Sequence, residues 1–470
     1  MSNPALAGDL PEQRLSAYVA ALPGRPLAEA TRARLAQALL DWFTAGWSAL
    51  DMASTATYRA LGERLHPERG TAWVFGGKAG QGVLGAAFGN GAITHLREID
   101  DTHRAATLHP GVVAVSPVLA LAAGAAVTQA RAMAAILAGY EVAIRVGEAL
   151  GAGHYQRFHS TATAGSLGAA AAAGVMLGLD ARQMHDALGI AATQAAGLWQ
   201  IVDDGAHESK ALHPAFAVRN GVTAAYAAQL GLPGARAFFS GQRGLFALLH
   251  GNGDPAALSH GLGEADKLVE ATIKAWPTCG QIFTALDCTA ELMAELAAEL
   301  GEAAVAQSIE AIEVRTYPQA LQVAGVDWPS KPGEVGFSPR YCVAALLLHG
   351  RLGLAEVEAP TPDDPALRAL ASRIELVTDD EHERGFPQWR PCTVTLTLKD
   401  GRRLQKHRMT RRGDPEEPFD WPGMLARSRA FAPRMPAEAL AQVAGWCERV
   451  REAAAEAPFE VPGAGLFGVV

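Results

Sequence analysis

Apolar and polar positions divide the chain into a helical part and a part that mixes helices with strands. From Glu12 to Leu61, apolar residues recur at helical spacing with proline and glycine as punctuation, so we expect several helices there. The stretch from Phe158 to Leu179 places polar side chains in front of a long run of alanine and glycine. Because such small side chains let other helices come close, we predict that this helix is central and buried.

The start of this predicted helix carries chemistry as well as structure. His159, Ser160, Thr161 and Thr163 are expected to cap its first turn with their side chains. A helix start also concentrates unpaired N–H groups and the positive end of the helix dipole, so a carboxylate can rest there beside a histidine. The pattern therefore predicts one wall of an active site. The alternative is that His159 only caps the helix or packs in a core.

Acidic and basic residues also precede a second apolar helix. Asp100, Asp101, Thr102 and His103 come shortly before His109 and the residues Pro110 and Gly111, which mark the helix start. Asp100, Asp101, His103 and His109 are conceivable metal ligands, but their spacing matches no tight ligand motif, and we expect no metal. Acid–base chemistry uses the same residue types without a metal.

A third alanine-rich helix begins after Lys210 and His213. Lysines are mostly exposed, so Lys210 taken alone is as well explained by a solvated loop as by ligand binding. Three helix starts with charged or titratable groups nevertheless favour a shared site. The glycine-dense segment from Phe75 to Asn90 does not provide a phosphate loop, because Ala79 stands where serine or threonine would hold magnesium.

After Gly261 the pattern changes to that of an α+β domain. Helices are predicted at Leu286–Leu300, Cys342–His349 and Pro436–Ala457, and strands at Ala271–Lys274, Ile309–Tyr317, Ile374–Val377, Thr393–Lys399 and Arg403–Met409, with a hairpin turn at Asp400-Gly401. The last helix is expected to return to the first domain. We therefore predict a mostly α protein with a discontinuous all-helical domain (1–265 and the returning segment 416–470) and a smaller α+β domain (266–415).

Composition limits the classes of partner. The chain of 470 residues exceeds what a single core usually serves, so we expect two domains. A net charge of −9 without a long basic run argues against nucleic acid and anionic membrane surfaces. The five cysteines are scattered without a Cys-x-x-Cys pair, so we expect neither disulfides nor zinc, and a cytoplasmic location fits. We identify no signal peptide and no membrane span.

Four separated blocks resemble the MmgE/PrpD family. They are EIDDTH with HPG; GHYQRFHSTATAGSLGAAAAAGVMLGLD; SKALHPAFAVRNG; and IKAWPTC with FSPRYCVAALLLHG. The family includes 2-methylcitrate dehydratases, cis-aconitate decarboxylases and iminodisuccinate epimerases. The resemblance implies a homodimer with a helical domain, a lid and an active site between them. The positions that match the family's catalytic and substrate-binding residues are Asp101, Thr102, His109, His159, Lys210, Lys274 and Tyr341, and we add His213 as a substrate-binding residue. Glu98 and Phe283 depart from the usual aspartate and histidine.

The resemblance implies a cofactor-independent enzyme that removes a proton next to a carboxylate. Lysines neutralise the carboxylate, and His109 and His159 exchange protons. Loss of water then gives a dehydratase, loss of CO₂ a decarboxylase, and return of the proton to the other face an epimerase. We predict a lyase of the 2-methylcitrate dehydratase type acting on a di- or tricarboxylate. The alternatives are an iminodisuccinate-like epimerase, a cis-aconitate decarboxylase and a non-catalytic carboxylate-binding paralogue.

Overall fold

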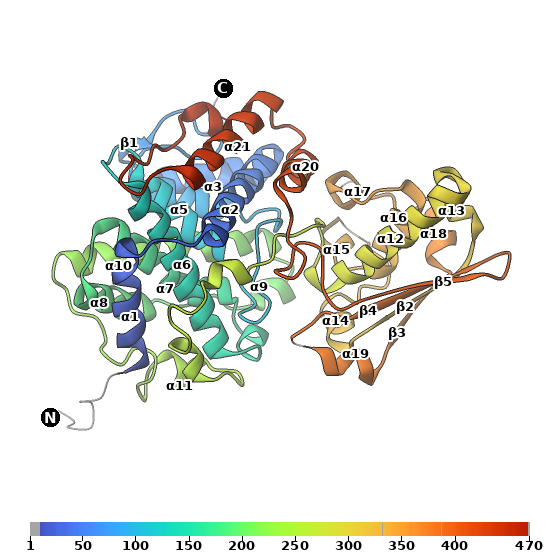
Figure 1. Ribbon diagram of the computed structural model, residues 1–470, viewed down its shortest axis with the longest axis horizontal. Coiled ribbons are helices and arrows are strands. Elements are labelled where there is room, and N and C mark those ends of the chain that lie inside the picture. The colour runs from blue at the N-terminus through green and yellow to red at the C-terminus, as the bar shows by residue number, and fades with distance from the viewer. Residues whose placement is uncertain (1–9, 331, 359, 387, 469–470) are drawn as a thin grey trace. The chain divides into compact units, whose positions relative to one another are not determined.

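A computed structural model describes residues 10–468 of the protein, except 331, 359 and 387. The chain forms two compact units (Figure 1). The first unit comprises the chain up to Thr272 and again from Met424, and the second runs from Ile273 to Gly423. Each unit has its own hydrophobic core.

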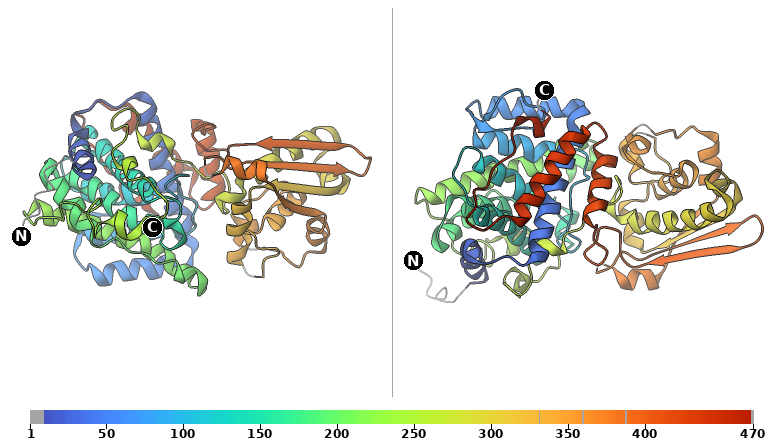
Figure 2. Two further views of the ribbon diagram at one scale, coloured as in Figure 1. Left: turned by 90° about the horizontal axis from the view of Figure 1, so that it is seen from below. Right: turned by 45° about the horizontal axis from the view of Figure 1, so that its top comes forward.

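The first unit is built almost entirely from helices. Their bounds are α1 (Pro11–Ala21), α2 (Glu29–Ser48), α3 (Ala53–Leu65), α4 (Val83–Ile93), α5 (Pro110–Ala122), α6 (Gln129–Leu150), α7 (Ser160–Leu177), α8 (Ala181–Ala192), α9 (Gln200–Asp203), α10 (Leu212–Gln229), α11 (Leu245–Leu249), α20 (Trp421–Phe431) and α21 (Ala437–Glu452). A short strand, β1 (Arg69–Ala72), forms bridges only to Gln81 among the described residues. The C-terminal helix α21 packs against α2 near the start of the chain (Figure 2).

Helix α7 is the centre of the first unit, as the sequence predicts. Every residue from Ser160 to Met176 is buried, and α7 packs against α5, α6, α8 and α10. Its small residues permit this packing, because a Cβ on Gly168 would lie 2.8 Å from the carbonyl oxygen of Gly139 on α6. Among the described residues, α7 is the helix long and apolar enough to cross a membrane, but burial inside the unit identifies it as a core helix.

The second unit combines helices with a four-stranded sheet. The strands are β2 (Ile309–Thr316), β3 (Ile374–Thr378), β4 (Cys392–Leu398) and β5 (Arg403–Arg408), in the order β3-β2-β4-β5. Strand β2 pairs parallel to β3 and antiparallel to β4, and β4 forms a hairpin with β5. The helices are α12 (Phe283–Leu300), α13 (Glu302–Ser308), α14 (Pro318–Val323), α15 (Pro332–Val335), α16 (Pro339–His349), α17 (Leu354–Glu358), α18 (Pro365–Ala371) and α19 (Asp380–Gly385).

The hairpin follows its predicted turn chemistry. Gly401 adopts φ 89°, a left-handed conformation that glycine tolerates without the penalty of a Cβ. Helices α12 and α16 pack against the sheet, where apolar side chains of β2 and β4 enter the core. Buried cysteines, valines and leucines therefore hold helices and sheet together in this unit.

The predicted mostly α fold is confirmed, with one wrong strand. Residues Ala271–Lys274 alternate as a strand does, but Thr272 forms only an isolated bridge to Thr102. A short 3₁₀ helix, Lys267–Glu270, ends directly before this segment, and the two-residue pairing does not extend into a sheet. The remaining predicted strands and the helices at Leu286–Leu300 and Cys342–His349 correspond to β2 to β5, α12 and α16. The predicted helix Pro436–Ala457 is shorter, since α21 ends at Glu452.

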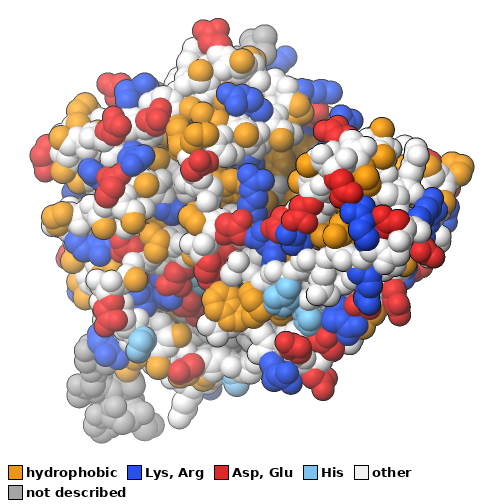
Figure 3. Space-filling model, turned by 45° about the vertical axis from the view of Figure 1, so that its right-hand side comes forward, with side chains coloured by type: hydrophobic (Ala, Val, Ile, Leu, Met, Phe, Trp, Pro, Cys, Tyr) orange, Lys and Arg blue, Asp and Glu red, His pale blue; other side chains and the backbone are white. Residues whose placement is uncertain are grey.

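Charges of both signs are interspersed over the protein surface shown in Figure 3. Such mixing agrees with the modest net charge of −9 over 470 residues. It offers nucleic acid no long basic stripe on that face.

Candidate active site

Three helix starts in the first unit meet at a cluster of histidines. His109 directly precedes α5, His159 directly precedes α7, and His213 lies in the first turn of α10. The ring centroids of His159 and His213 are 5.3 Å apart, and those of His109 and His159 are 6.4 Å apart. Helix N-termini carry partial positive charge, so this arrangement favours a bound carboxylate.

Local backbone bonds fix these helix starts. The amide of His109 donates to Thr161 Oγ1 at 3.1 Å, which joins the start of α5 to the first turn of α7. The amide of His159 donates to the carbonyl of Gly197 at 2.8 Å. The prediction that the His159 side chain caps α7 is wrong, because its ring makes no capping bond and instead reaches His213, with 3.1 Å between the two Nδ1 atoms.

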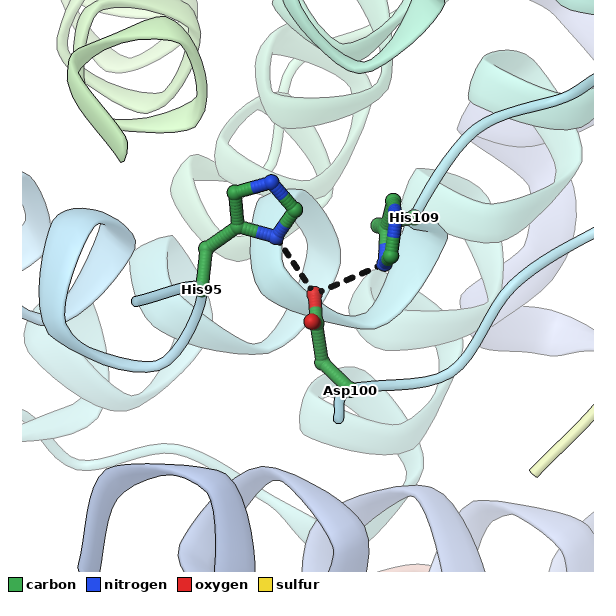
Figure 4. Close-up of side chains that lie close together, drawn as sticks. All are labelled: His95, Asp100 and His109. Atoms are coloured by element: carbon green, nitrogen blue, oxygen red, sulfur yellow. Dashed lines mark hydrogen bonds and ion pairs between the residues drawn. The ribbon is translucent and has the colours of Figure 1, made fainter. Parts of the chain in front are cut away.

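A buried carboxylate holds two of the imidazoles (Figure 4). Asp100 Oδ2 lies 2.9 Å from Nδ1 of His95 and 3.1 Å from Nδ1 of His109. Burial alone would raise the pKa of Asp100, but the two neighbouring histidines, which stabilise its charge, hold that pKa well below its ordinary value. Asp100 is therefore ionised at neutral pH. It orients both rings and stabilises whichever of them gains a proton.

His159 has the opposite electrostatic environment. Its side chain is fully buried, and burial together with the positive charge of Lys210 lowers its pKa well below 6.5. Burial lowers the pKa of His213 to about 4, and His95 and Lys210 add to this effect. Both rings are therefore neutral at pH 7 and able to accept a proton. Nε2 of His159 is buried and has no hydrogen-bond partner among the described residues.

Lys210 and Trp199 lie next to the histidines. Lys210 belongs to a short 3₁₀ helix, His207–Ala211, that leads into α10. Its Nζ lies 2.5 Å from Oε2 of Glu98 and 5.6 Å from the ring centroid of Trp199. The Trp199 ring in turn lies 4.7 Å from that of His159. The site thus combines a cation, an apolar ring and a proton acceptor.

Asp101 and Thr102 have different surroundings from Asp100. The Asp101 carboxylate accepts from the amide of Gly111 at 2.9 Å and from the hydroxyl of Tyr140 at 2.6 Å. Burial and the charge of Asp41 raise the pKa of Asp101 to about 7. Thr102 exchanges two backbone hydrogen bonds with Thr272, at 2.9 and 2.6 Å. These contacts support the start of α5, and none of them joins Asp101 to the histidine cluster.

Lys274 and Tyr341 belong to the second unit. Lys274 is buried, with 5% of its surface exposed. The hydroxyl of Tyr341, on α16, accepts from the amide of Thr361 at 3.1 Å and donates to the carbonyl of Glu356 at 3.4 Å. Burial raises the pKa of this tyrosine. Participation of both residues in the reaction stays a prediction.

His95 and Trp199 are site residues that the sequence analysis did not identify. His95 follows the end of α4 and lies in the same polar stretch as Asp100, five positions earlier. Its short distance in sequence from Asp100 was the signal that could have identified it. Trp199 follows an irregular segment between α8 and α9, where no periodic pattern indicates which side chains point inward.

Two groups of side chains have the donor atoms that a metal ion needs. One is His95, Asp100 and His109, and the other is His103, Glu148 and Glu270, each with its ligand atoms within 4.8 Å of one another. In the second group, Nζ of Lys267 lies 3.1 Å from Glu148 and 3.0 Å from Glu270. In the first group, Asp100 Oδ2 forms a hydrogen bond with His95 and an ion-pair contact with His109.

Comparison with known proteins gives matches along most of the chain. The model of the MmgE/PrpD N-terminal domain matches residues 13–258, and that of the C-terminal domain matches residues 276–450. A cis-aconitate decarboxylase of Aspergillus terreus is 36% identical over 149 residues, and the match covers 30% of each chain. The cis-aconitate decarboxylase of Homo sapiens is 27% identical over 361 residues, covering 74% of this chain and 73% of the relative.

A 2-methylcitrate dehydratase of Cupriavidus necator is 36% identical over 101 residues, covering 20% of this chain and 21% of the relative. The matches to the Aspergillus terreus and Cupriavidus necator proteins thus span less than a third of those relatives. The two domain models, in contrast, together span both structural units in the expected order. The chain belongs to the MmgE/PrpD family.

Proposed function

We propose that this protein is a lyase that moves a proton at a carbon atom next to a carboxylate of a small di- or tricarboxylate. One observation carries the proposal: a buried, neutral His159 with an unpartnered Nε2 lies beside a second imidazole, His109, that contacts the ionised Asp100. A neutral imidazole accepts a proton, and an imidazole against a carboxylate is stabilised when it carries one. The pair supplies a base and an acid.

The site also supports carboxylate binding. Hydrogens next to a carboxylate become acidic when the negative charge is neutralised, and Lys210 and the helix starts of α5, α7 and α10 supply positive charge. In this mechanism, His159 takes the proton from carbon. His109 gives a proton to the leaving group or to another carbon, and the Asp100 charge holds its ring in place. Lys274 is proposed to bind a further carboxylate.

Loss of water is the reaction that the sequence predicts. His159 removes the proton from carbon, the neighbouring C–O bond breaks, and the hydroxide leaves as water with a proton from His109. The similarity to the Cupriavidus necator protein named 2-methylcitrate dehydratase supports this reaction, and that similarity covers 20% of the chain.

Loss of CO₂ is the second candidate. It is favoured because the similarity to proteins named cis-aconitate decarboxylases extends over more of the chain than the similarity to the dehydratase. The relatives that match 74% of this chain are named cis-aconitate decarboxylases. In decarboxylation, the C–C bond to one carboxylate breaks, the double bond shifts, and the acid delivers a proton to carbon. Decarboxylation therefore depends more on the proton donor, His109, than on the base, His159. Epimerisation stays as an alternative, because return of the proton uses the same groups.

A substrate panel in D₂O tests the proposal. Purified protein is incubated with 2-methylcitrate, cis-aconitate and iminodisuccinate, and each reaction is followed by proton NMR. Dehydration of 2-methylcitrate at its methyl-bearing carbon removes the methine signal and turns the methyl doublet into a singlet, whereas decarboxylation releases CO₂ and places deuterium on product carbon. Epimerisation exchanges a proton without loss of a group. Binding of carboxylates without any turnover would favour a non-catalytic paralogue instead.

The assembly and location also belong to the proposal. We propose a homodimer, as the family resemblance implies, and a cytoplasmic location. Multi-angle light scattering at micromolar concentration tests the first, and fractionation of the source cells tests the second.

A further inference from the structure

A buried ion pair holds the backbone on both sides of Asp100. The carbonyl oxygen of Ile99 accepts from Nη2 of Arg427 at 2.6 Å, and the amide of Asp101 donates to Oδ2 of Asp41 at 2.9 Å. The same Nη2 lies 2.8 Å from Oδ1 of Asp41. The two peptide groups that flank Asp100 are therefore both bound to one pair of side chains, the Arg427–Asp41 pair.

The Arg427–Asp41 pair has a fixed place in the first unit. Each of the two side chains is only 3% exposed. The guanidinium of Arg427 lies 4.7 Å from the ring centroid of Phe431, one turn further along α20. The hydroxyls of Ser428 and Thr44 lie 2.7 Å apart and join α20 to α2, the helix that carries Asp41. A planar guanidinium held in this way has little freedom to move.

The segment that carries Asp100 has no regular structure to fix it. Between α4 and α5, where every residue is described, the chain forms no helix and no named strand. Glu98 has φ 52°, a conformation that persists where the surroundings impose it. The carboxylate of Asp100 nevertheless lies 2.9 Å from Nδ1 of His95 and 3.1 Å from Nδ1 of His109 (Figure 4). Small displacements of this segment would break one of these contacts.

We propose that Arg427 and Asp41 are positioning residues that hold Asp100 against the proton donor His109. They act through the backbone of Asp100 and transfer no proton themselves. The C-terminal segment thus serves the histidine cluster from 328 positions beyond Ile99. The inference rests on the proposed function in so far as Asp100 serves the reaction. A buried ion pair can also be merely structural, so the test must separate position from stability.

Arg427→Lys changes the position of the donor and keeps its charge. The ammonium of lysine is one bond closer to the backbone than Nη2 and has no guanidinium plane. Because a misplacement of about 1 Å can cost roughly 10²-fold in rate, kcat should fall about 10- to 100-fold, with KM within a few-fold. The assay uses the member of the substrate panel that the parent protein converts.

A double-mutant cycle with Asp100→Asn identifies the route of this effect. If Arg427 acts through Asp100, then Arg427→Lys should lower kcat by less than about twofold further in the Asp100→Asn protein. A merely structural role would give the same loss of kcat in both backgrounds. Circular dichroism and urea unfolding compare the stability of all four proteins.

Hydrogen exchange tests the Arg427–Asp41 pair without any substrate. The amide of Asp101 donates to Asp41, so its exchange reports whether the segment stays in place. In Arg427→Lys, peptides that contain Asp101 should exchange at least about tenfold faster by mass spectrometry, while peptides from α8 stay unchanged. General destabilisation would instead accelerate exchange in both regions.

Arg145→Lys is the matched control. Arg145 is also buried, pairs with Glu141 at 2.8 Å and donates to the carbonyl of His260 at 2.6 Å, away from the histidine cluster. Its replacement should leave kcat and the exchange of Asp101 peptides within about twofold of the parent values.

Asp41→Asn is a second variant, for the case that Arg427→Lys does not fold. Asparagine keeps an acceptor for the amide of Asp101 but loses the charge that holds the guanidinium. It should lower kcat about tenfold, and Asp100→Asn should again mask this loss.

The inference is overturned by parent turnover in Arg427→Lys, by an equal loss in the Asp100→Asn background, or by unchanged exchange at Asp101. It is also overturned if neither Arg427→Lys nor Asp41→Asn folds, because the pair is then structural. The proposed function survives each of these results if the parent converts a member of the substrate panel. A parent without turnover would refute the proposed function, and exchange at Asp101 would still decide whether the pair holds the segment.

Discussion

Replacing His159 by glutamine should separate proton transfer from structure. Glutamine has similar volume and keeps a hydrogen-bonding group toward His213, which now lies with its Nδ1 3.1 Å from that of His159. It cannot accept and return a proton. Because a positioned general acid or base contributes roughly 10²–10⁴-fold, kcat should fall by that factor while KM changes by only a few-fold.

The same variant should also change how the free energy of unfolding depends on pH. The folded protein keeps His159 neutral well below pH 6.5, whereas in the unfolded chain the residue titrates near its ordinary 6.5. Below pH 6.5 the unfolded chain binds more protons at this residue than the folded protein does. The free energy of unfolding therefore falls as the pH falls. Protonation of an imidazole with the ordinary pKa of 6.5 in the unfolded chain sets the upper limit of this loss between pH 7 and pH 5 at about 2 kcal/mol. His159→Gln should therefore show a pH dependence smaller by up to this amount.

Urea unfolding at pH 7 and pH 5, followed by circular dichroism, measures this difference. His185→Gln is the matched control, because its ring contacts Ser16 at 3.2 Å, the carbonyl of Arg236 at 2.8 Å and the ring of Phe238, none of which belongs to the histidine cluster. An unfolded His159→Gln protein at pH 7 would show that His159 is a structural residue. A folded variant with the parent turnover rate would refute the assignment of the base, and the role would pass to His109 or the family-based mechanism would fail.

Three further predictions test the surroundings of this residue. Activity should survive EDTA treatment, measured by the turnover rate; full loss restored by a divalent ion would make His95, Asp100 and His109 metal ligands. Lys274→Ala should weaken substrate binding by on the order of 2–5 kcal/mol, because a substrate carboxylate loses its partner in a partly buried site; an unchanged inhibitor Kd would remove Lys274 from the substrate-binding set. Asp101→Ala should lower the free energy of unfolding by about 1–3 kcal/mol with little change in KM, because the Gly111 amide and the Tyr140 hydroxyl lose their acceptor; reduced kcat in a fully stable variant would support the catalytic role that the sequence predicts.

The sequence by itself determined the elements whose causes are local. Helix α5 begins at Pro110, because proline has the backbone angle of a helix and needs no hydrogen bond there. The alanine and glycine run of α7 predicts burial, since such side chains only serve close packing. Asp400 and Gly401 form the hairpin turn between β4 and β5. The resemblance to the MmgE/PrpD family likewise depends on residues in order along the chain, and both domain models agree with it.

Only the tertiary structure decided which of two adjacent carboxylates faces the histidines. Asp100 contacts His95 and His109, while Asp101 contacts Tyr140 on another helix. The two residues lie in an irregular segment, where no helical or strand period fixes the direction of a side chain. The partner of Asp101, Tyr140, lies on α6 and is distant in sequence, whereas His95 and His109 lie close to Asp100 along the chain. The packing of small residues around α7 sets which of these helix starts meet, and that geometry is a property of the assembled core.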